Sequence, residues 1–316
     1  DNLFEEPDNK WLVTGPSQSP ETGFILPNGT RGSLCLGPTI DMQQLRELFG
    51  NTVQAARILG VDKELQDELL AKRKRLAPNQ IAPDGLLQEW LKPYEGREPT
   101  HRHLSPFYGL YPYNEITPES TPELAEACRK LLKQRAVGQS GGFSNAWKVN
   151  LFARLGEAEK AWEFVRRMLT DNGFDNMMSR FRPLLRADGK PEKILLIMDA
   201  NFGTTAGIAE MLMQSHPKSG EINAEPIIHL LPALPKAWHE GSISGLRARG
   251  GFEVDVGWED GKLIECKITS LFGNPVKVRY GSETKQLNLK KGESRTLSFG
   301  QIAEKSTPFT NAKPLV

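Results

Sequence analysis

The sequence predicts an α+β multidomain protein in which a helical region, residues 1–224, precedes a smaller β region, residues 225–316. Two observations predict this division. Apolar residues recur at helical spacing through much of the first two-thirds of the chain, whereas residues 252–258 alternate strictly between apolar and polar side chains, as a half-buried strand does. The length of 316 residues is sufficient for one large domain or two ordinary ones.

Helices are expected in order along the first region. Residues 38–60 form the first, and Gly60 is well placed as the residue that follows its last turn. Residues 63–75 form the second, and the third begins where Thr121 can cap with Pro122 at the first helical position. Further helices are expected over residues 145–155, 158–170 and 205–214. Successive helices joined by long, aromatic-rich loops indicate an α/α architecture whose chemistry lies in the loops.

Short strands between turn residues are expected after residue 225. The dipeptide Asp260-Gly261 follows the alternating segment and indicates a hairpin. Runs bounded by Gly, Asn and Pro then predict strands over residues 262–270, 276–280, 285–289 and 294–299. This region is too small to be the active domain, and we expect it to pack against the helices.

Charge and cysteine usage exclude several classes of protein. The 40 Lys and Arg nearly balance the 39 Asp and Glu, so the net charge of +1 indicates neither a nucleic-acid partner nor an anionic membrane surface. No apolar run is long enough to span a bilayer, and the polar residues 1–10 are not a signal peptide. The three cysteines lie far apart, so we expect neither a zinc site nor a disulfide framework, and Cys128 and Cys266 are expected to be buried.

Two loop clusters in the first region could carry chemistry. Glu21 follows Ser-Pro in a stretch rich in Pro, Gly and Ser, where it could be a general acid or simply a solvated surface glutamate. The run from His101 to His103 precedes three tyrosines and suits a sugar site, because polar groups bind hydroxyls and flat rings stack on sugars. The alternative is a loop held by its own hydrogen bonds. A metal site through the two histidines has no apparent third ligand in the sequence.

Two further clusters lie near helices. Glycines at the start of residues 141–148 allow a backbone to approach a ligand closely, and Trp147 could stack on it or belong to the core. Asp199 at a helix entrance could position a water molecule, or it could be the N-cap of the helix expected from Thr205. The glycines of this segment do not have the spacing of a phosphate-binding motif.

Blocks of sequence over residues 11–280 occur in the order of a known family. The most specific are WLVTGPSQSPET, HRHLSPFYGLYP, GGFSNAWKVNLFARL, DANFGTTAGIAEMLMQSH and GSISGLRARGGFEVDVGW. They resemble glycoside hydrolase family 95, which contains α-1,2-L-fucosidases and related α-L-galactosidases. The resemblance implies a partial α/α six-hairpin barrel followed by a small antiparallel β-sandwich domain.

The resemblance also implies roles for particular residues. Glu21 matches the general acid that protonates the glycosidic oxygen, and Asp199 matches a carboxylate that helps to activate water on the opposite face of the sugar, which inverts the anomeric centre. Substrate binding is expected of Arg102, His103, Trp147 and Asn201. The expected substrate is a fucosylated oligosaccharide or glycan, cleaved without a metal or other cofactor, and a periplasmic or secreted location is implied.

The chain also departs from the family pattern. Thr22 stands where the family has Asn, Ala200 stands where it has Gly, and residues 182–198 form a longer run in which a sugar-binding histidine has no counterpart. The asparagines that act with the base lie upstream of Asp1 in family members. We therefore expect a C-terminal fragment, a processed half that acts with an N-terminal half of the same enzyme, or a non-catalytic carbohydrate-binding or structural homologue.

Overall fold

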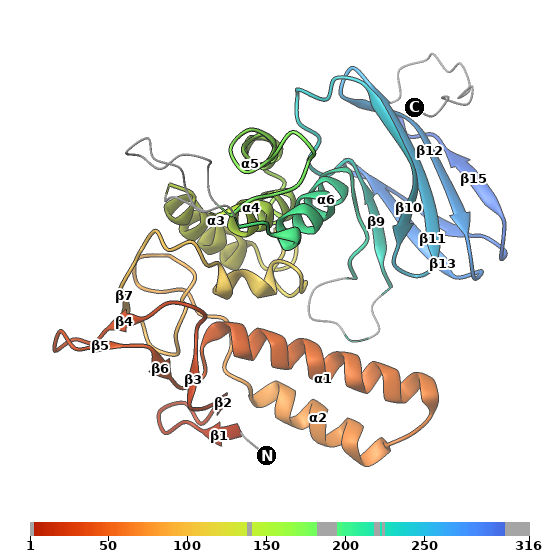
Figure 1. Ribbon diagram of the computed structural model, residues 1–316. Helices are drawn as coiled ribbons and strands as arrows, with labels where there is room; N and C mark the ends of the chain where they lie inside the picture. Colours follow the sequence, from red (N-terminus) through yellow and green to blue (C-terminus); the bar gives the residue numbers. More distant parts are fainter. Residues whose placement is uncertain (1–2, 138–140, 182–194, 218–221, 223–224, 301–316) are drawn as a thin grey trace. The chain divides into compact units, whose positions relative to one another are not determined.

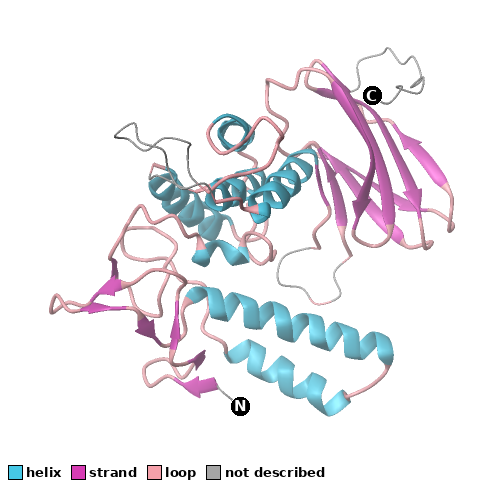
Figure 2. Ribbon diagram, viewed as in Figure 1, coloured by secondary structure: helices cyan, strands magenta, loops and turns pink. Residues whose placement is uncertain are grey.

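The computed structural model describes residues 3–137, 141–181, 195–217, 222 and 225–300 (Figures 1 and 2). The chain divides into two compact units, Asp1–Ile208 with Pro217–Ala224, and Ala209–His216 with Glu225–Val316. Most helices belong to the first unit and the longer strands belong to the second, which confirms the α+β composition. The barrel and the sandwich stay predictions.

Short strands that the sequence patterns did not indicate open the first unit. β1 (Leu3–Glu5) pairs with β2 (Leu12–Thr14), β3 (Ser17–Gln18) pairs with β6 (Leu34–Cys35), and β4 (Phe24–Ile25) lies between β5 (Arg31–Gly32) and β7 (Glu95–Gly96). Elements of two or three residues are too short to show an alternating pattern. The register of β4 on β7 places Phe24 opposite Gly96, so that residues 19–23 lie next to the loop that follows β7.

The first two helices form a hairpin, as predicted. α1 (Thr39–Leu59) ends at Gly60, whose φ of 71° is the left-handed conformation that glycine adopts most readily, and α2 (Lys63–Arg75) follows (Figure 1). The inner face of the hairpin closes a core built from Leu12, Val13, Met42, Phe49, Leu76 and Ala77.

α3 (Pro122–Ala136) begins after Thr121, as the Thr-Pro signal predicted, but the cap differs. The Thr121 hydroxyl makes no bond to the helix; instead it accepts the Thr117 N–H at 2.9 Å. The side chain therefore fixes the turn before the helix. A 3-10 helix, η1 (Ser105–Gly109), precedes α3 in the chain.

α4 (Gly142–Arg154) and α5 (Ala158–Thr170) form a second hairpin, in which the rings of Phe152 and Phe164 stack with their centroids 5.6 Å apart. α4 begins three residues before the predicted position, since its first residue is Gly142 and the predicted one was 145. A glycine in the first turn weakens the sequence signal for a helix start.

α6 (Met198–Leu212) begins at Met198, and the predicted start at Thr205 was wrong. Gly203 and Gly207 lower the intrinsic helix propensity of this segment, but they allow close packing. A Cβ added at Gly203 would lie 3.1 Å from Ala146 Cβ, and one at Gly207 would lie 2.5 Å from Val149 Cγ1. The later residue of α6, Gly207, contacts the later residue of α4, Val149, so the two helices run parallel.

In its described residues, the second unit contains two four-stranded sheets. β10 (Gly241–Ala248), β11 (Phe252–Glu259), β12 (Lys262–Ser270) and β15 (Ser294–Leu297) form an antiparallel sheet. The second sheet has the order β14 (Glu283–Asn288), β13 (Pro275–Tyr280), β9 (Ile227–Leu230), β8 (Met213–Gln214). The alternation predicted for β11 is confirmed, because Phe252, Val254, Val256 and Trp258 are buried.

One pairing in the second unit corrects the expectation of a purely antiparallel domain. β9 and β13 are parallel, with Ile228 opposite Val278. The two strands are separated in the chain by the three long strands of the other sheet, β10 to β12, which provide the crossover that a parallel pair requires. Among the residues that the structure describes, no helix is long and apolar enough to cross a membrane.

Candidate active site

Glu21 lies in the short loop between β3 and β4, and its side chain is 63% exposed. The loop is a tight turn, in which the Thr22 N–H donates to the Ser19 carbonyl at 2.9 Å. Ser19 itself is fully buried. The fold therefore anchors the backbone of the turn and presents the carboxylate to solvent.

Residues 97–105, which follow β7, lie directly against this turn. The Arg97 N–H donates to the Gly23 carbonyl at 2.9 Å. At the other end of the segment, the Ser105 hydroxyl donates to the Pro20 carbonyl. These two bonds bring Arg102 and His103 beside Glu21, although 81 positions separate Arg102 from Glu21 in the sequence.

Glu21, Arg102 and His103 form one cluster. Arg102 Nη2 lies 2.8 Å from Glu21 Oε2, and His103 Nε2 lies 3.3 Å from the same oxygen. Burial lowers the pKa of His103 below its usual 6.5, and the Arg102 guanidinium acts in the same direction while the Glu21 carboxylate opposes it. His103 is therefore neutral at pH 7 and can donate one hydrogen bond. We refer to these three residues as the acid cluster.

His101 belongs to the structure of the loop. Its Nδ1 accepts the His103 N–H at 3.2 Å, and the two imidazole rings stack with their centroids 5.2 Å apart. Burial lowers the pKa of His101. In the described part of the chain, no group of three or more His, Cys, Asp or Glu side chains could hold a metal ion.

A buried ion pair lies behind the acid cluster and was not singled out from the sequence. Glu89 Oε1 accepts the Ser19 hydroxyl at 2.7 Å, its Oε2 accepts from Arg135 Nη2, and Arg135 Nη1 donates to the His103 carbonyl at 2.8 Å. A signal was present: Arg135 continues the apolar stripe of α3, and Glu89 interrupts an apolar run. A charged residue at a core position indicates a buried partner.

Asp199 lies at the start of α6 and is exposed. Its Oδ1 accepts the Ala200 N–H at 2.9 Å. Because α6 begins at Met198, Asp199 lies in the first helical turn, and the alternative of an N-cap for a helix from Thr205 is excluded.

The first turn of α4 connects the region of Asp199 with the acid cluster. The Ser144 hydroxyl donates to the Arg102 carbonyl at 2.6 Å. A Cβ added at Gly142 would lie 3.2 Å from the Ala200 Cβ. The first turn of α4 therefore contacts both the loop of Arg102, whose guanidinium pairs with Glu21, and the start of α6, where Asp199 lies.

Trp147 and Asn201 make structural bonds near this place. The Trp147 indole N–H donates to the Tyr111 carbonyl at 3.0 Å, and the half-buried ring lies against Phe143 with centroids 5.7 Å apart. Asn201 Oδ1 accepts the Ser179 N–H at 2.8 Å, and its Nδ2 donates to the Met177 carbonyl at 2.7 Å. The Asn201 amide thus holds the turn before the inserted run. Most of that run, residues 182–194, lies outside the described residues.

Comparisons with known proteins agree over nearly the whole chain. Residues 1–212 match the glycosyl hydrolase family 95 catalytic domain, and residues 214–313 match the C-terminal domain of the same family. The chain is 37% identical over 274 residues to alpha-L-fucosidase 2 of Arabidopsis thaliana, which covers 82% of the chain and 30% of that protein. It is 30% identical over 267 residues to a probable alpha-fucosidase A of Aspergillus niger, which covers 81% of the chain and 32% of that protein. The chain thus spans about a third of the length of these relatives.

Proposed function

Because the chain belongs to glycoside hydrolase family 95, we propose that it carries part of the active site of an enzyme that removes terminal α-L-fucose from glycans. We further propose that the linkage is α-1,2 and that the reaction inverts the anomeric centre. The observation that carries the proposal is the acid cluster: an exposed carboxylate with one oxygen that accepts a hydrogen bond from Arg102 at 2.8 Å and lies 3.3 Å from His103 Nε2. This arrangement also favours a hydrolase over a non-catalytic fragment.

Glu21 is proposed as the general acid. In an inverting hydrolase one carboxylic acid protonates the glycosidic oxygen as the bond to the anomeric carbon breaks. The exposure of Glu21 leaves room for a glycosidic oxygen, and Arg102 and His103 can stabilise the carboxylate that remains after proton transfer. If Arg102 turns to a sugar hydroxyl when substrate binds, Glu21 is free to carry its proton.

Asp199 is proposed to support activation of the water molecule. As the bond from the anomeric carbon to the glycosidic oxygen breaks, the water oxygen forms the new bond to that carbon. The water passes its proton to a base, which the Asp199 carboxylate provides or polarises. The first turn of α4 contacts the segments that hold Arg102 and Asp199, which supports a shared site for the two carboxylates.

The remainder of the pocket is proposed to come from an N-terminal part of the same enzyme. The chain spans about a third of its relatives, so other segments of such proteins are available to complete the site. In addition, α1 exposes Leu48 and Ile58, and α6 exposes Phe202. We propose that another segment of the enzyme covers these side chains.

The test is release of L-fucose from 2′-fucosyllactose by this chain and by the longest natural protein that contains it. Glu21→Gln and Asp199→Asn should each lower the rate by about 10²- to 10⁴-fold, the usual contribution of acid or base catalysis. Glu126→Gln, at an exposed glutamate of α3, is the matched control and should retain the parental rate. Proton NMR of the first product should show β-L-fucose.

Three results would count against the proposal. The absence of turnover by both folded proteins would contradict the hydrolase. Rates within tenfold of the parent in Glu21→Gln would remove Glu21 as the acid, since a lost general acid costs more than about tenfold. Initial appearance of α-L-fucose would contradict inversion.

A further inference from the structure

We propose that the buried ion pair of Glu89 and Arg135 positions Glu21 for proton donation, because it fixes the turn that contains Glu21 against the loop that contains His103. The inference rests on the proposed function, since it concerns the placement of the same acid. Both side chains are buried and act on Glu21 through other groups, so each is proposed as a positioning residue.

Four contacts form a closed ring that includes Glu21, and we refer to this ring of contacts as the circuit. Ser19, two residues before Glu21, donates to Glu89 at 2.7 Å. Glu89 accepts from Arg135, and Arg135 donates to the His103 carbonyl at 2.8 Å. His103 closes the circuit, because its Nε2 lies 3.3 Å from Glu21 Oε2. A displacement of either loop must break one of these bonds.

Burial makes the circuit stiff. The side chains of Arg135 and Glu89 are 6% and 5% exposed. Hydrogen bonds to ionised groups in a weakly screened interior are stronger than those at the surface, so the two backbone segments attached to them have little freedom. Glu21, in contrast, is 63% exposed and could adopt many rotamers if its turn were free.

A structural role alone does not explain the arrangement well. Replacing a buried ion pair by apolar residues of similar volume is often neutral or stabilising, so such a pair is weak evidence for stability. The neighbours of Arg135 on the buried stripe of α3 are Cys128, Leu131 and Leu132, an apolar surrounding that another apolar residue would fit. The specific gain from the ion pair is its connection to Ser19 and to the His103 carbonyl.

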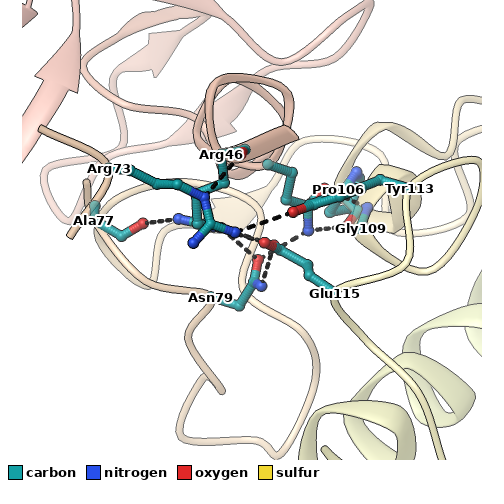
Figure 3. Close-up of polar contacts among 9 residues, drawn as sticks. Arg46, Arg73, Ala77, Asn79, Pro106, Gly109, Tyr113 and Glu115 are labelled. Carbon is teal, nitrogen blue, oxygen red and sulfur yellow. Dashed lines mark hydrogen bonds and ion pairs between the residues drawn. The ribbon is translucent and has the colours of Figure 1, made fainter. Parts of the chain in front are cut away.

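A second buried ion pair in the same unit provides a matched control. Arg46 Nε lies 2.7 Å from Glu115 Oε2, and these side chains are 12% and 8% exposed (Figure 3). Arg46 also donates to the Ala77 carbonyl at 2.6 Å, and Asn79 donates to Glu115. This network connects α1 with the loops at 77–79 and 113–116. Its loss should lower stability without moving Glu21.

The first experiment compares two substrates that differ in their need for an acid. Lactose leaves 2′-fucosyllactose as a poor leaving group that must be protonated, whereas fluoride leaves α-L-fucosyl fluoride as an anion. Glu21→Gln should lower kcat/KM for 2′-fucosyllactose by about 10²-fold or more while leaving the fluoride much less affected. The quantity to compare is kcat/KM for 2′-fucosyllactose divided by kcat/KM for the fluoride. Glu89→Gln and Ser19→Ala should lower this ratio by roughly 10- to 100-fold, as expected for a misplaced acid. Glu115→Gln should leave the ratio unchanged.

The second experiment needs no turnover. The Glu21 carboxylate raises the pKa of His103 against the effects of burial and Arg102, so His103 reports whether Glu21 is in place. Ser19→Ala changes no charge; if it releases the turn, the pKa of His103 measured by NMR should fall toward its value in Glu21→Gln. If Glu89→Gln fails to fold, Ser19→Ala still decides both experiments.

The outcomes separate the two proposals. If Glu21→Gln changes the substrate ratio but folded Ser19→Ala changes neither the ratio nor the titration of His103, the positioning role is refuted and the proposed function stands. If Glu21→Gln itself leaves the ratio unchanged, the proposed role of Glu21 as the general acid fails. A fall in the pKa of His103 in Ser19→Ala would then support only the claim that Ser19 holds the turn of Glu21, and not the claim that this placement assists proton donation.

Discussion

Replacing Lys148 by Met should stabilise this protein. Lys148 lies on α4 with no exposed surface, and its Nζ has no hydrogen-bond partner among the described residues. The favourable contact of the buried ammonium group is a cation–π interaction with the Phe164 ring, whose centroid is 5.3 Å from Nζ. Burial lowers the pKa of Lys148 from 10.5 to about 8, and the charges of Arg167 and Arg135 act in the same direction.

The size of the effect follows from this shift. A lowering from 10.5 to about 8 corresponds to a penalty of roughly 3 kcal/mol on the charged form in the folded state. Loss of the cation–π contact with Phe164 would offset about 1 kcal/mol of the gain. Because Met keeps the length and the unbranched shape of the side chain, Lys148→Met should raise the free energy of unfolding by about 1–3 kcal/mol at pH 7.

The pH dependence tests the cause. Below pH 8 the ammonium is charged in both the folded and the unfolded state, so the penalty is fully present. Between pH 8 and 10.5 the folded protein loses its proton first, and the stability of the parent rises relative to the variant. Above pH 10.5 the advantage of Met from the removed charge disappears.

Urea unfolding followed by circular dichroism at pH 7 and pH 10 measures both effects. Lys160→Met, at an exposed lysine of α5 paired with Glu163 at 3.0 Å, is the control and should change stability little at either pH. A destabilised Lys148→Met would refute the reasoning, because removal of the charge would then bring no net gain in the folded protein. A gain of equal size at pH 7 and pH 10 would also refute it.

Three further predictions concern packing, buried charge and thiols. Gly207→Ala gains about 1 kcal/mol of helix propensity but places Cβ 2.5 Å from Val149 Cγ1, so we expect a net loss of stability, partly reversed by adding Val149→Ala, in thermal unfolding. Glu115→Gln leaves the Arg46 guanidinium buried without its carboxylate and should lower the free energy of unfolding by about 3–5 kcal/mol; an unchanged Tm would contradict this. Burial raises the pKa of Cys35 to about 11, so a disulfide reagent at pH 8 should label the native protein slowly and the unfolded protein at all 3 cysteines, and rapid native labelling would contradict the burial.

Local patterns were sufficient where one element determines its own conformation. The bounds of α1, α2 and α5 agree with the apolar periodicity within a residue, and Gly60 ends α1 as predicted. The alternation in β11 identified its buried face. The same reasoning placed the start of α6 at Thr205 instead of Met198, because its glycines reduce helix propensity and their value lies in contact with another helix.

For the candidate site, the sequence by itself determined which residues to inspect. The resemblance of the sequence to a glycoside hydrolase family identified Glu21, Arg102 and His103. The structure places side-chain nitrogens of Arg102 and His103 next to the same carboxylate oxygen of Glu21. Only the tertiary structure showed that Glu89 and Arg135 connect their loops, and that the first turn of α4 reaches toward Asp199. Periodicity and turn signals act over a few residues, whereas Ser19 and Glu89 are 70 positions apart and Glu89 and Arg135 are 46 apart. Contacts at such separations depend on how the elements pack, which no local pattern encodes.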